Sequence, residues 1–326
     1  MRQYIIRRIL IGIIVLLGVS IMLYSLMRLM PSDYVSLTTS TSPKMTDEMR
    51  NHLREIYGLD KTLVGGYLDW LWAALHGDLG TSLMFARPVS DVIKQYAPVT
   101  FSVAIISLIL QLLIAIPLGI LAARKQYSTT DFVITIFVFM GISMPIFFLA
   151  AILKRWFGFY GFNILPISGM LNARVNYPDH MTFAKFLDYA RHLTLPIACF
   201  VITGCGGLLR YTRTNMLETL SADYVRTARA KGVPEHVVVH SHAFRNTLIP
   251  IVTILGSTLP ALFSGAAITE GLFALEGLGN IALKAANMAD VPYMMGFNVF
   301  LALLTIIGYI ICDILYAVVD PRVRLS

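Results

Sequence analysis

Charged residues are scarce in this chain. Only 14% of its 326 residues are Asp, Glu, Lys or Arg, whereas 56% are hydrophobic, and the mean hydropathy is +0.70. A soluble domain carries charge on about a quarter of its residues, so this composition excludes an ordinary soluble domain. The chain is therefore expected to lie in a lipid bilayer.

Cysteine is also scarce, and its placement excludes two kinds of cross-link. Cys199, Cys205 and Cys312 all lie in apolar segments and match neither a disulfide framework nor a metal-binding spacing, so we expect them to be packing residues. The histidines close together in sequence, His236 to His242, suggest a metal site at first sight. No Asp, Glu or Cys completes a compact ligand set around them, so we predict no metal.

Signatures of catalysis are missing as well. No lysine follows a glycine, so the chain has no Gly-Lys-Ser/Thr phosphate loop and cannot hydrolyse ATP by that route. No Gly-x-Ser-x-Gly sequence occurs, and all seven histidines lie outside the apolar segments or at their edges. We therefore predict that the chain is not an enzyme and holds no cofactor of its own.

Long apolar runs dominate what is present. Six segments approach or exceed the roughly 20 residues that cross a hydrocarbon core. They are Ile9–Met27, Val99–Ala123, Phe132–Leu153, Leu193–Leu209, Ile251–Thr269 and Met295–Val319. The first is too long for a signal peptide and no small-x-small cleavage site follows it, so we expect an uncleaved span. The predicted fold is an all-α integral membrane protein with six transmembrane helices, an extracellular helical cap and a cytoplasmic coupling helix.

The positions of Lys and Arg predict the orientation. Basic residues precede the first span, follow the second and fourth, and end the chain. They are Arg2, Arg7, Arg8, Arg124, Lys125, those from Arg210 to Arg245, Arg322 and Arg324. The positive-inside rule makes this side cytoplasmic, with both termini inside. Topology thus explains the net charge of +7, and no clustered basic patch of a soluble domain indicates a nucleic-acid partner.

Four segments follow from this topology. Residues 1–30 hold the N-terminus and first span, 31–98 an extracellular cap, 99–319 a five-helix core with a coupling loop at 210–250, and 320–326 a cytoplasmic tail. In the cap, Thr46-Asp47-Glu48 predicts a helix start, Gly58 a stop, and Gly77-Asp78-Leu79-Gly80 a turn. The third outer loop, Glu270 to Met294, predicts a re-entrant or helical plug.

The stretch from Asp223 to Pro250 predicts a short helix, a tight turn and a second helix. Leu220, Tyr224 and Ala228 fall four apart on one expected face, and Arg226 and Arg229 lie on another. Gly232 can end the first helix, and Pro234 with Glu235 can open the second. Small Ala228 on the packing face predicts a surface that docks a partner; the alternative is a basic loop that only fixes orientation. The candidate docking residues are Leu220, Asp223, Tyr224, Arg226, Ala228, Arg229, Gly232, Arg245 and Asn246.

Polar and kinked positions inside the spans are candidates for a translocation path. These are Ser143, Met144 and Pro145 in the third span, and Ser257 and Ser264 in the fifth. Packing of helices through small residues is an equal alternative. Pro117 and Pro145 are expected to mark kinks. Asp313 lies close to the cytoplasmic end of the last span, so we expect a structural role for it.

Several short strings, in this order, together resemble one family. They are Tyr57-Gly58-Leu59-Asp60, Gly77-Asp78-Leu79-Gly80-Thr81-Ser82, Ser143-Met144-Pro145, Leu165-Pro166 with Gly169, Tyr224 through Gly232, Arg245-Asn246 within His242 to Pro250, Gly277-Leu278-Gly279 and Asp320-Pro321-Arg322. Over nearly its whole length the chain resembles the permeases of ATP-binding-cassette importers, in the dipeptide/oligopeptide/nickel branch.

The resemblance implies partners and a mechanism. Such permeases lie in bacterial or archaeal cell membranes, pair with a second, similar permease and with two cytoplasmic ATPase subunits that bind ATP and Mg, and receive substrate from an external binding protein. The helix after Asp223 would sit in an ATPase groove, so that ATPase closure tilts the spans. Peptides are the first expected substrate, and nickel or another small solute is the alternative. An independent channel or secondary transporter is a rival, but it would be expected to show paired intramembrane charges.

Overall fold

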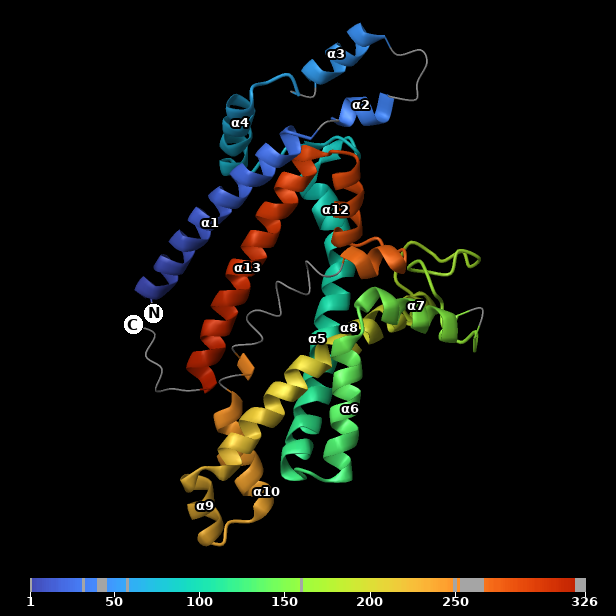
Figure 1. The fold of residues 1–326 in the computed structure, drawn as a ribbon. Coiled ribbons are helices and arrows are strands. Elements are labelled where there is room, and N and C mark those ends of the chain that lie inside the picture. Colours follow the sequence, from blue (N-terminus) through green and yellow to red (C-terminus); the bar gives the residue numbers. More distant parts are fainter. Residues whose placement is uncertain are drawn as a thin grey trace. The chain divides into compact units, whose positions relative to one another are not determined.

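The computed structural model describes residues 2–30, 33–39, 46–56, 59–158, 161–248, 251–252 and 267–319. These residues are mostly helical, with one two-stranded antiparallel hairpin, and Figure 1 traces their order. The chain divides into two compact units. The first comprises Met1–Thr100 with Glu276–Ile307, and the second comprises Phe101–Leu275 with Gly308–Ser326.

The first unit packs around a helix that the sequence analysis placed in an outer loop. Its elements are α1 (Arg2–Arg28), α2 (Tyr34–Thr39), α3 (Asp47–Ile56), α4 (Leu63–Leu75), β1 (Thr81–Ser82), β2 (Arg87–Pro88), the start of α5 (Val89–Arg124), α12 (Leu278–Asn287) and most of α13 (Val291–Val319). Helix α12 buries Leu278, Ile281 and Ala285 at helical spacing against Val89 of α5 and Tyr293 of α13. The 270–294 loop therefore contains a helix, as predicted.

A buried carboxylate joins the β1–β2 hairpin to the start of α13 through hydrogen bonds. Asp290 Oδ2 accepts hydrogen bonds from Ser82 Oγ at 2.6 Å and from the Met84 amide at 3.0 Å. Asp290 Oδ1 accepts from the Tyr293 amide at 3.1 Å, which is the geometry of an N-terminal helix cap. One side chain thus starts α13 and fixes the β1–β2 hairpin, whose strands pair Thr81 with Pro88 and Ser82 with Arg87.

Local signals in the cap region are confirmed where the structure describes them. Helix α3 begins at Asp47, and Thr46 Oγ1 accepts from the Met49 amide at 3.3 Å. Gly77 and Gly80 both have φ of 86°, and Asp78 Oδ1 accepts from the Gly80 amide at 2.8 Å, so the predicted turn is present. The predicted stop at Gly58 lies outside the described residues.

The second unit is a set of closely packed helices. Its elements are the rest of α5, α6 (Thr129–Ser143), α7 (Ile146–Phe157), α8 (Phe183–Ser221), α9 (Asp223–Ala230), α10 (Glu235–Val237), the π-helix η1 (Val238–Phe244) and the end of α13. Helices α6 and α8 approach so closely that a Cβ built on Gly141 would lie 2.6 Å from the Ile202 carbonyl oxygen. Glycine is therefore required at that crossing, as is common between helices in membranes.

Among the described residues, four helices are long and apolar enough to cross a membrane. They are Ile9–Arg28, Val89–Arg124, Phe183–Ser221 and Val291–Leu315, and α6 with α7 makes a fifth if that bent pair is one span. The four long helices correspond to the first, second, fourth and sixth predicted spans, and the bent pair corresponds to the third. Most of the predicted fifth span, and the 320–326 tail, lie outside the described residues. Helix α8 extends well beyond the predicted Leu193–Leu209, because a hydropathy window marks only the apolar part of a helix.

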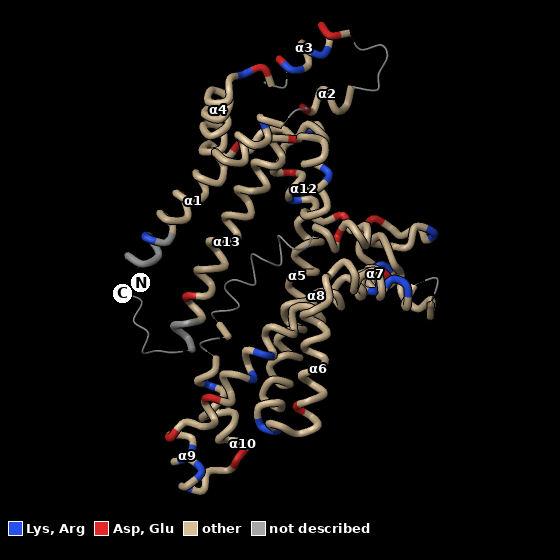
Figure 2. Tube along the Cα trace, in the orientation of Figure 1, with Lys and Arg blue, Asp and Glu red and all other residues tan. Residues whose placement is uncertain are grey.

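The prolines act differently in the two helices where kinks were expected. Pro145 directly precedes α7, which is bent by 107° from α6, so the third predicted span is two helices rather than one. Helix α5 runs through Pro117 without interruption. The helices also differ in how many charged residues they carry. Figure 2 shows Lys, Arg, Asp and Glu on α3 and around α9 and α10, while α1 is uncharged over most of its length.

Candidate functional site

The candidate hairpin, residues 223–248, starts at a sharp break after α8. Ala222 has extended backbone angles, φ −69° and ψ 149°, between the end of α8 at Ser221 and the start of α9 at Asp223. Leu220 therefore belongs to α8, and the expectation that it shares a helical face with Tyr224 and Ala228 is wrong. The acidic Asp223 in the first turn favours a new helix start at this point.

The end of α9 is defined by its backbone. Gly232 has φ of 75°, its amide donates to the Arg229 carbonyl at 2.9 Å, and the Val233 amide donates to the Ala228 carbonyl at 3.2 Å. This pair of bonds is a Schellman motif, which needs a left-handed residue such as glycine after the helix. The predicted stop at Gly232 is confirmed.

The apolar face of α9 points into the chain rather than outward. Val225 is fully buried and Ala228 is 7% exposed, and both pack in a cluster with side chains of α5, α8 and η1. The other buried members of that cluster are Ile120, Ala123, Met216, Val238, Val239 and Ala243. The expectation that Ala228 presses against a partner is therefore wrong. Its small size serves close packing inside the hairpin, which a sequence pattern cannot distinguish from packing against another protein.

The opposite face of α9 is exposed and polar. Asp223 and Arg226 lie on it, with side chains that are 98% and 70% exposed, and the exposed Tyr224 and Arg229 flank the buried face. Their ion pair has a 3.7 Å separation, and pairs of such exposure contribute little to stability. Arg245, in the second helix of the hairpin, is exposed too.

Two side-chain contacts hold the helices of the hairpin together. Asn246 Nδ2 donates to the Tyr224 hydroxyl at 2.8 Å, so the structure brings together two residues that were predicted from separate motifs. Arg229 Nε and Nη2 donate to the two carboxylate oxygens of Glu235 at 3.1 and 2.9 Å. The hydrogen bonds from Arg229 lower the pKa of Glu235, and those to Glu235 raise the pKa of Arg229.

The second helix opens as expected but continues in an unexpected form. Pro234 precedes α10, which begins at Glu235, and the chain then follows a π-helix over Val238–Phe244 before returning to α-helix at 245–248. The π-turns bury Val238, Val239 and Ala243 together. The nearby histidines are exposed, and no group of three metal-ligating side chains occurs among the residues that the structure describes.

A partly buried ion pair in the second unit was not predicted from the sequence. Arg213 of α8 donates from Nε and Nη2 to the two carboxylate oxygens of Asp131 in the first turn of α6, both at 2.8 Å. Asp131 is 4% exposed and also accepts from the Tyr127 amide at 3.0 Å. The local signal was a capping box, since Ser128 Oγ accepts from the Asp131 amide before an apolar run. Nothing in the sequence pointed to Arg213.

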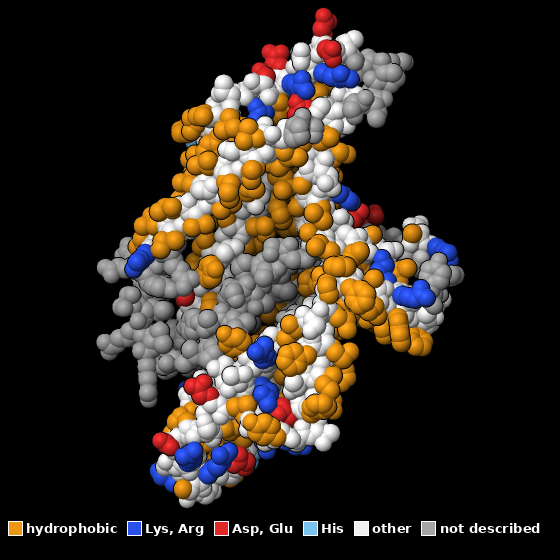
Figure 3. All heavy atoms as spheres, in the orientation of Figure 1, with side chains coloured by type: hydrophobic (Ala, Val, Ile, Leu, Met, Phe, Trp, Pro, Cys, Tyr) orange, Lys and Arg blue, Asp and Glu red, His pale blue; other side chains and the backbone are white. Residues whose placement is uncertain are grey.

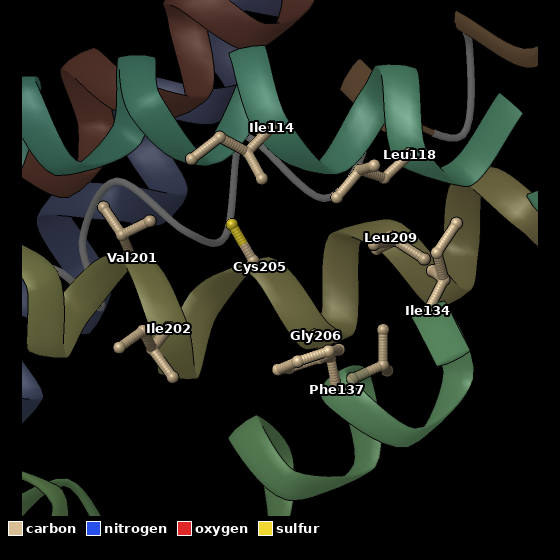
Figure 4. A pocket seen from close by; sticks show the side chains of 10 residues that line it. Ile114, Leu118, Ile134, Phe137, Val201, Ile202, Cys205, Gly206 and Leu209 are labelled. Atoms are coloured by element: carbon tan, nitrogen blue, oxygen red, sulfur yellow. The ribbon is translucent and has the colours of Figure 1, made fainter. Parts of the chain in front are cut away.

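The candidate path residues are only partly visible. Ser143 ends α6, Met144 is extended, and Pro145 precedes α7, so all three form the break in the bent pair; Ser143 and Pro145 are exposed and Met144 is half-buried. Ser257 and Ser264 lie outside the described residues. A separate cavity of about 300 Å³ lies among α5, α6 and α8 (Figure 4). Its lining is Ile114, Leu118, Ile134, Phe137, Val138, Val201, Ile202, Cys205, Gly206 and Leu209, and it includes none of the candidate path residues.

Asp313 and the three cysteines lie in the predicted spans. Asp313 is 6% exposed, Cys199 and Cys312 are buried, and Cys205 is half-buried; the three cysteines form no disulfide within the part of the chain that the structure describes. Cys312 Sγ donates to the Val252 carbonyl at 3.1 Å, and Cys205 Sγ lies 3.8 Å from the Gln111 carbonyl oxygen. The cysteines thus pack within the helices, as predicted.

Comparison with known proteins gives matches along nearly the whole chain. The family described as binding-protein-dependent transport system inner membrane component matches residues 115–325, and the N-terminal part of such membrane components matches residues 1–104. The chain is 37% identical over 325 residues to the oligopeptide transport system permease protein AppB of Bacillus subtilis (strain 168), covering 99% of this chain and 100% of that protein.

Two further relatives are similar over comparable lengths. A putative peptide permease protein of Brucella ovis is 35% identical over 331 residues, covering 100% of both chains. The probable D,D-dipeptide transport system permease protein DdpB of Escherichia coli (strain K12) is 35% identical over 324 residues, covering 95% of this chain and 94% of that protein.

Proposed function

This chain belongs to the binding-protein-dependent transport system inner membrane components, and from that premise we propose that it is the permease subunit of an ATP-driven importer of di- and oligopeptides. Membership makes it a multi-pass membrane protein and a transport component rather than an enzyme, with a substrate-binding protein and ATPases as partners. The peptide substrate is supported by the names of three relatives at 35% to 37% identity. Nickel or another small solute is the alternative.

The proposed assembly holds this chain, a second, similar permease, two ATPase subunits and an external binding protein in a bacterial or archaeal cell membrane. The ATPases bind ATP and Mg, and this chain binds no cofactor. Hairpin 223–248 and both termini face the cytoplasm in this proposal, because the basic residues gather on that side and the positive-inside rule applies to such loops. The 31–98 segment then lies on the outer side.

We propose that hairpin 223–248 is the coupling element, and the packing of its inner face carries this proposal. Val225 and Ala228 are buried against Ile120 of α5 and Met216 of α8, so the hairpin is seated on two helices at once. A force applied to α9 would therefore reach both helices. Coupling between distant sites requires such a packed element with two positions that each site can bias.

The residues of the hairpin take different parts in this proposal. The exposed Asp223, Tyr224, Arg226 and Arg229, with Arg245 and Asn246, offer the ATPase a polar surface with several charged side chains. Ala228 and Gly232 maintain the shape of α9 from within, and Leu220 supports it from the end of α8. The contacts of Tyr224 with Asn246 and of Arg229 with Glu235 keep the surface in one arrangement.

The translocation path is proposed to run past the break between α6 and α7. Broken helices often line substrate sites in transporters because their exposed backbone groups need polar partners, and Ser143 and Pro145 are exposed at this break. Ser257 and Ser264 are proposed to line the same path. The apolar cavity of Figure 4 offers a peptide few polar groups and is not assigned to it.

Reconstitution tests the proposed function. The chain should co-purify with ATPase subunits when it is expressed together with the other subunits of the proposed assembly. Vesicles that contain the whole assembly should then take up labelled di- and oligopeptides only with ATP inside and the binding protein outside. Vesicles that contain this chain alone should take up none. Uptake by the chain alone under an ion gradient would establish the secondary-transporter rival, and competition by nickel but not by peptides would establish the alternative substrate.

A further inference from the structure

Helix α4 runs back along the outer end of the first span. Arg28 Nη2, at the end of α1, donates to the Lys61 carbonyl at 2.6 Å, just before α4 begins. Further along α4, the Tyr67 hydroxyl and Ser20 Oγ are 2.9 Å apart, and the rings of Tyr67 and Tyr24 meet edge to face at 5.7 Å. Ser20 lies about two helical turns inside Arg28, on the order of 12 Å along α1. Because the candidate span in α1 is Ile9–Arg28, Tyr67 lies at a level within that span.

One side of α4 is buried against the rest of the protein, and another side is exposed and polar. Tyr67 is buried in a cluster with Tyr24, Val291 and Met295, and Trp70 and Leu71 pack against it. On another side, Asp69 is exposed and its carboxylate accepts from Lys61 Nζ at 2.7 Å. These two sides leave a third side of the helix.

The third side is a stripe of large apolar side chains. Val64 is 65% exposed, Leu68 56%, Trp72 68% and Leu75 74%, and their spacing of four, four and three residues places them on one side of an α-helix. Large apolar side chains of α1 are similarly exposed, among them Ile14 at 68% and Leu26 at 58%. Figure 3 shows orange side chains over α1 and again over α4.

We propose that the α4 stripe, Val64, Leu68, Trp72 and Leu75, is immersed in bilayer lipid, so that α4 is a partly inserted interfacial helix and not part of a water-exposed cap. The hydrogen bonds to Arg28 and Ser20 place α4 beside a span whose apolar surface faces lipid, and the stripe continues that surface. Helix α4 has 13 residues, too few to cross the membrane, and one Trp in the stripe with an Asp beside it suits the bilayer interface.

The occupant is thus the lipid that surrounds α1, rather than the binding protein or the second permease. Immersion itself does not rest on the proposed function. Only the choice of the outer leaflet rests on the proposed orientation, in which the Arg28 end of α1 faces outward.

Collision measurements on nitroxide labels test the proposal in the whole assembly in lipid nanodiscs. Labels are attached to cysteines at Leu68 and at its neighbour Asp69, in separate L68C and D69C variants, with the unmodified chain as the control for labelling of the native cysteines. Oxygen concentrates in lipid, and a water-soluble nickel chelate stays outside it. We expect the ratio of oxygen to chelate collisions at position 68 to exceed that at position 69 at least several-fold. A V64C variant provides the same comparison if L68C fails to assemble.

Two outcomes would overturn the proposal. Equal access of the chelate to positions 68 and 69 would make α4 part of a water-exposed cap. An immobilised label at position 68 that neither reagent reaches would mean that a protein subunit covers the stripe. ATP-driven peptide uptake is measured on the same assemblies. If positions 68 and 69 give the same collision ratio while peptide uptake is normal, only the immersion of α4 is contradicted. If the two ratios differ but no peptide is taken up, only the proposed function is contradicted.

Discussion

Substitution of Gly232 gives the sharpest prediction about the hairpin. A Cβ at this position would meet nothing within 4 Å, so the cost of a larger residue comes from the backbone and not from a clash. At φ of 75° an L-residue with a Cβ costs about 1–2 kcal/mol, and a β-branched residue is the least tolerant. That penalty shifts the equilibrium between the closed and opened turn by about 5- to 30-fold.

The Gly232→Val variant should therefore lose most ATP-driven uptake while the assembly stays in the membrane and hydrolyses ATP. Peptide uptake and ATP hydrolysis are measured in parallel in the same vesicles, and the ratio of the two is the quantity of interest. Gly232→Asn is the matched control, because Asn tolerates the left-handed region and should retain most of the coupling. Wild-type coupling in Gly232→Val would refute the reasoning, and so would equal losses in Val and Asn variants.

Three further predictions concern side-chain contacts: one in the second unit, one within hairpin 223–248 and one at the β1–β2 hairpin of the first unit. Asp131→Asn should destabilise the assembly by about 1–3 kcal/mol, because Arg213, which is 27% exposed, loses its carboxylate partner. Thermal unfolding of Asp131→Asn with Arg213→Met should show a smaller combined loss than the sum of the single losses; additive losses would mean that the pair does not interact. The hydrogen bonds from Arg229 lower the pKa of Glu235, so the Arg229–Glu235 contact contributes its full stability above the ordinary glutamate range and is lost as the pH falls through the folded pKa. Hydrogen exchange of α9 amides, corrected for intrinsic rates, should therefore accelerate on acidification below that range in the native chain but not in Glu235→Gln. Identical profiles would contradict the assignment. Asp290→Ala should lower the free energy of unfolding by about 1–3 kcal/mol for each donor left unsatisfied, and should expose the β1–β2 hairpin to protease. Asp78→Ala, at an exposed turn, is the control and should change protease sensitivity little. Equal sensitivity of the two variants would contradict the role given to Asp290.

Local features of the hairpin could be predicted from the sequence, because they depend on neighbouring residues. Gly232 ends α9 and Pro234 precedes α10, and both follow from backbone preferences that act within a few residues. The direction of the apolar face could not be predicted in this way. Ala228 suited close packing, but its partner is the chain's own core, and the expected face with Leu220 does not exist because the helix breaks at Ala222.

Features that depend on distant contacts were missed. Ser128 and Asp131 carry the sequence pattern of a helix start, but Arg213 is 82 positions from Asp131 and no periodicity relates them. Pro145 marked the place of a kink, while the 107° bend depends on how α6 and α7 pack on other helices. Helix α4 escaped notice because a search for runs of about 20 apolar residues does not detect a 13-residue helix.

The central claim is that an ATPase subunit docks on the exposed face of α9. A photoreactive cross-linker attached to a cysteine at Arg226 tests it in the assembled complex, and the same reagent at Asp69 of α4 serves as the control. The account predicts a nucleotide-sensitive cross-link from position 226 to an ATPase subunit and none from position 69. Failure of position 226 to reach an ATPase in an assembly that transports, or its modification by a membrane-impermeant reagent added outside intact cells, would contradict the account.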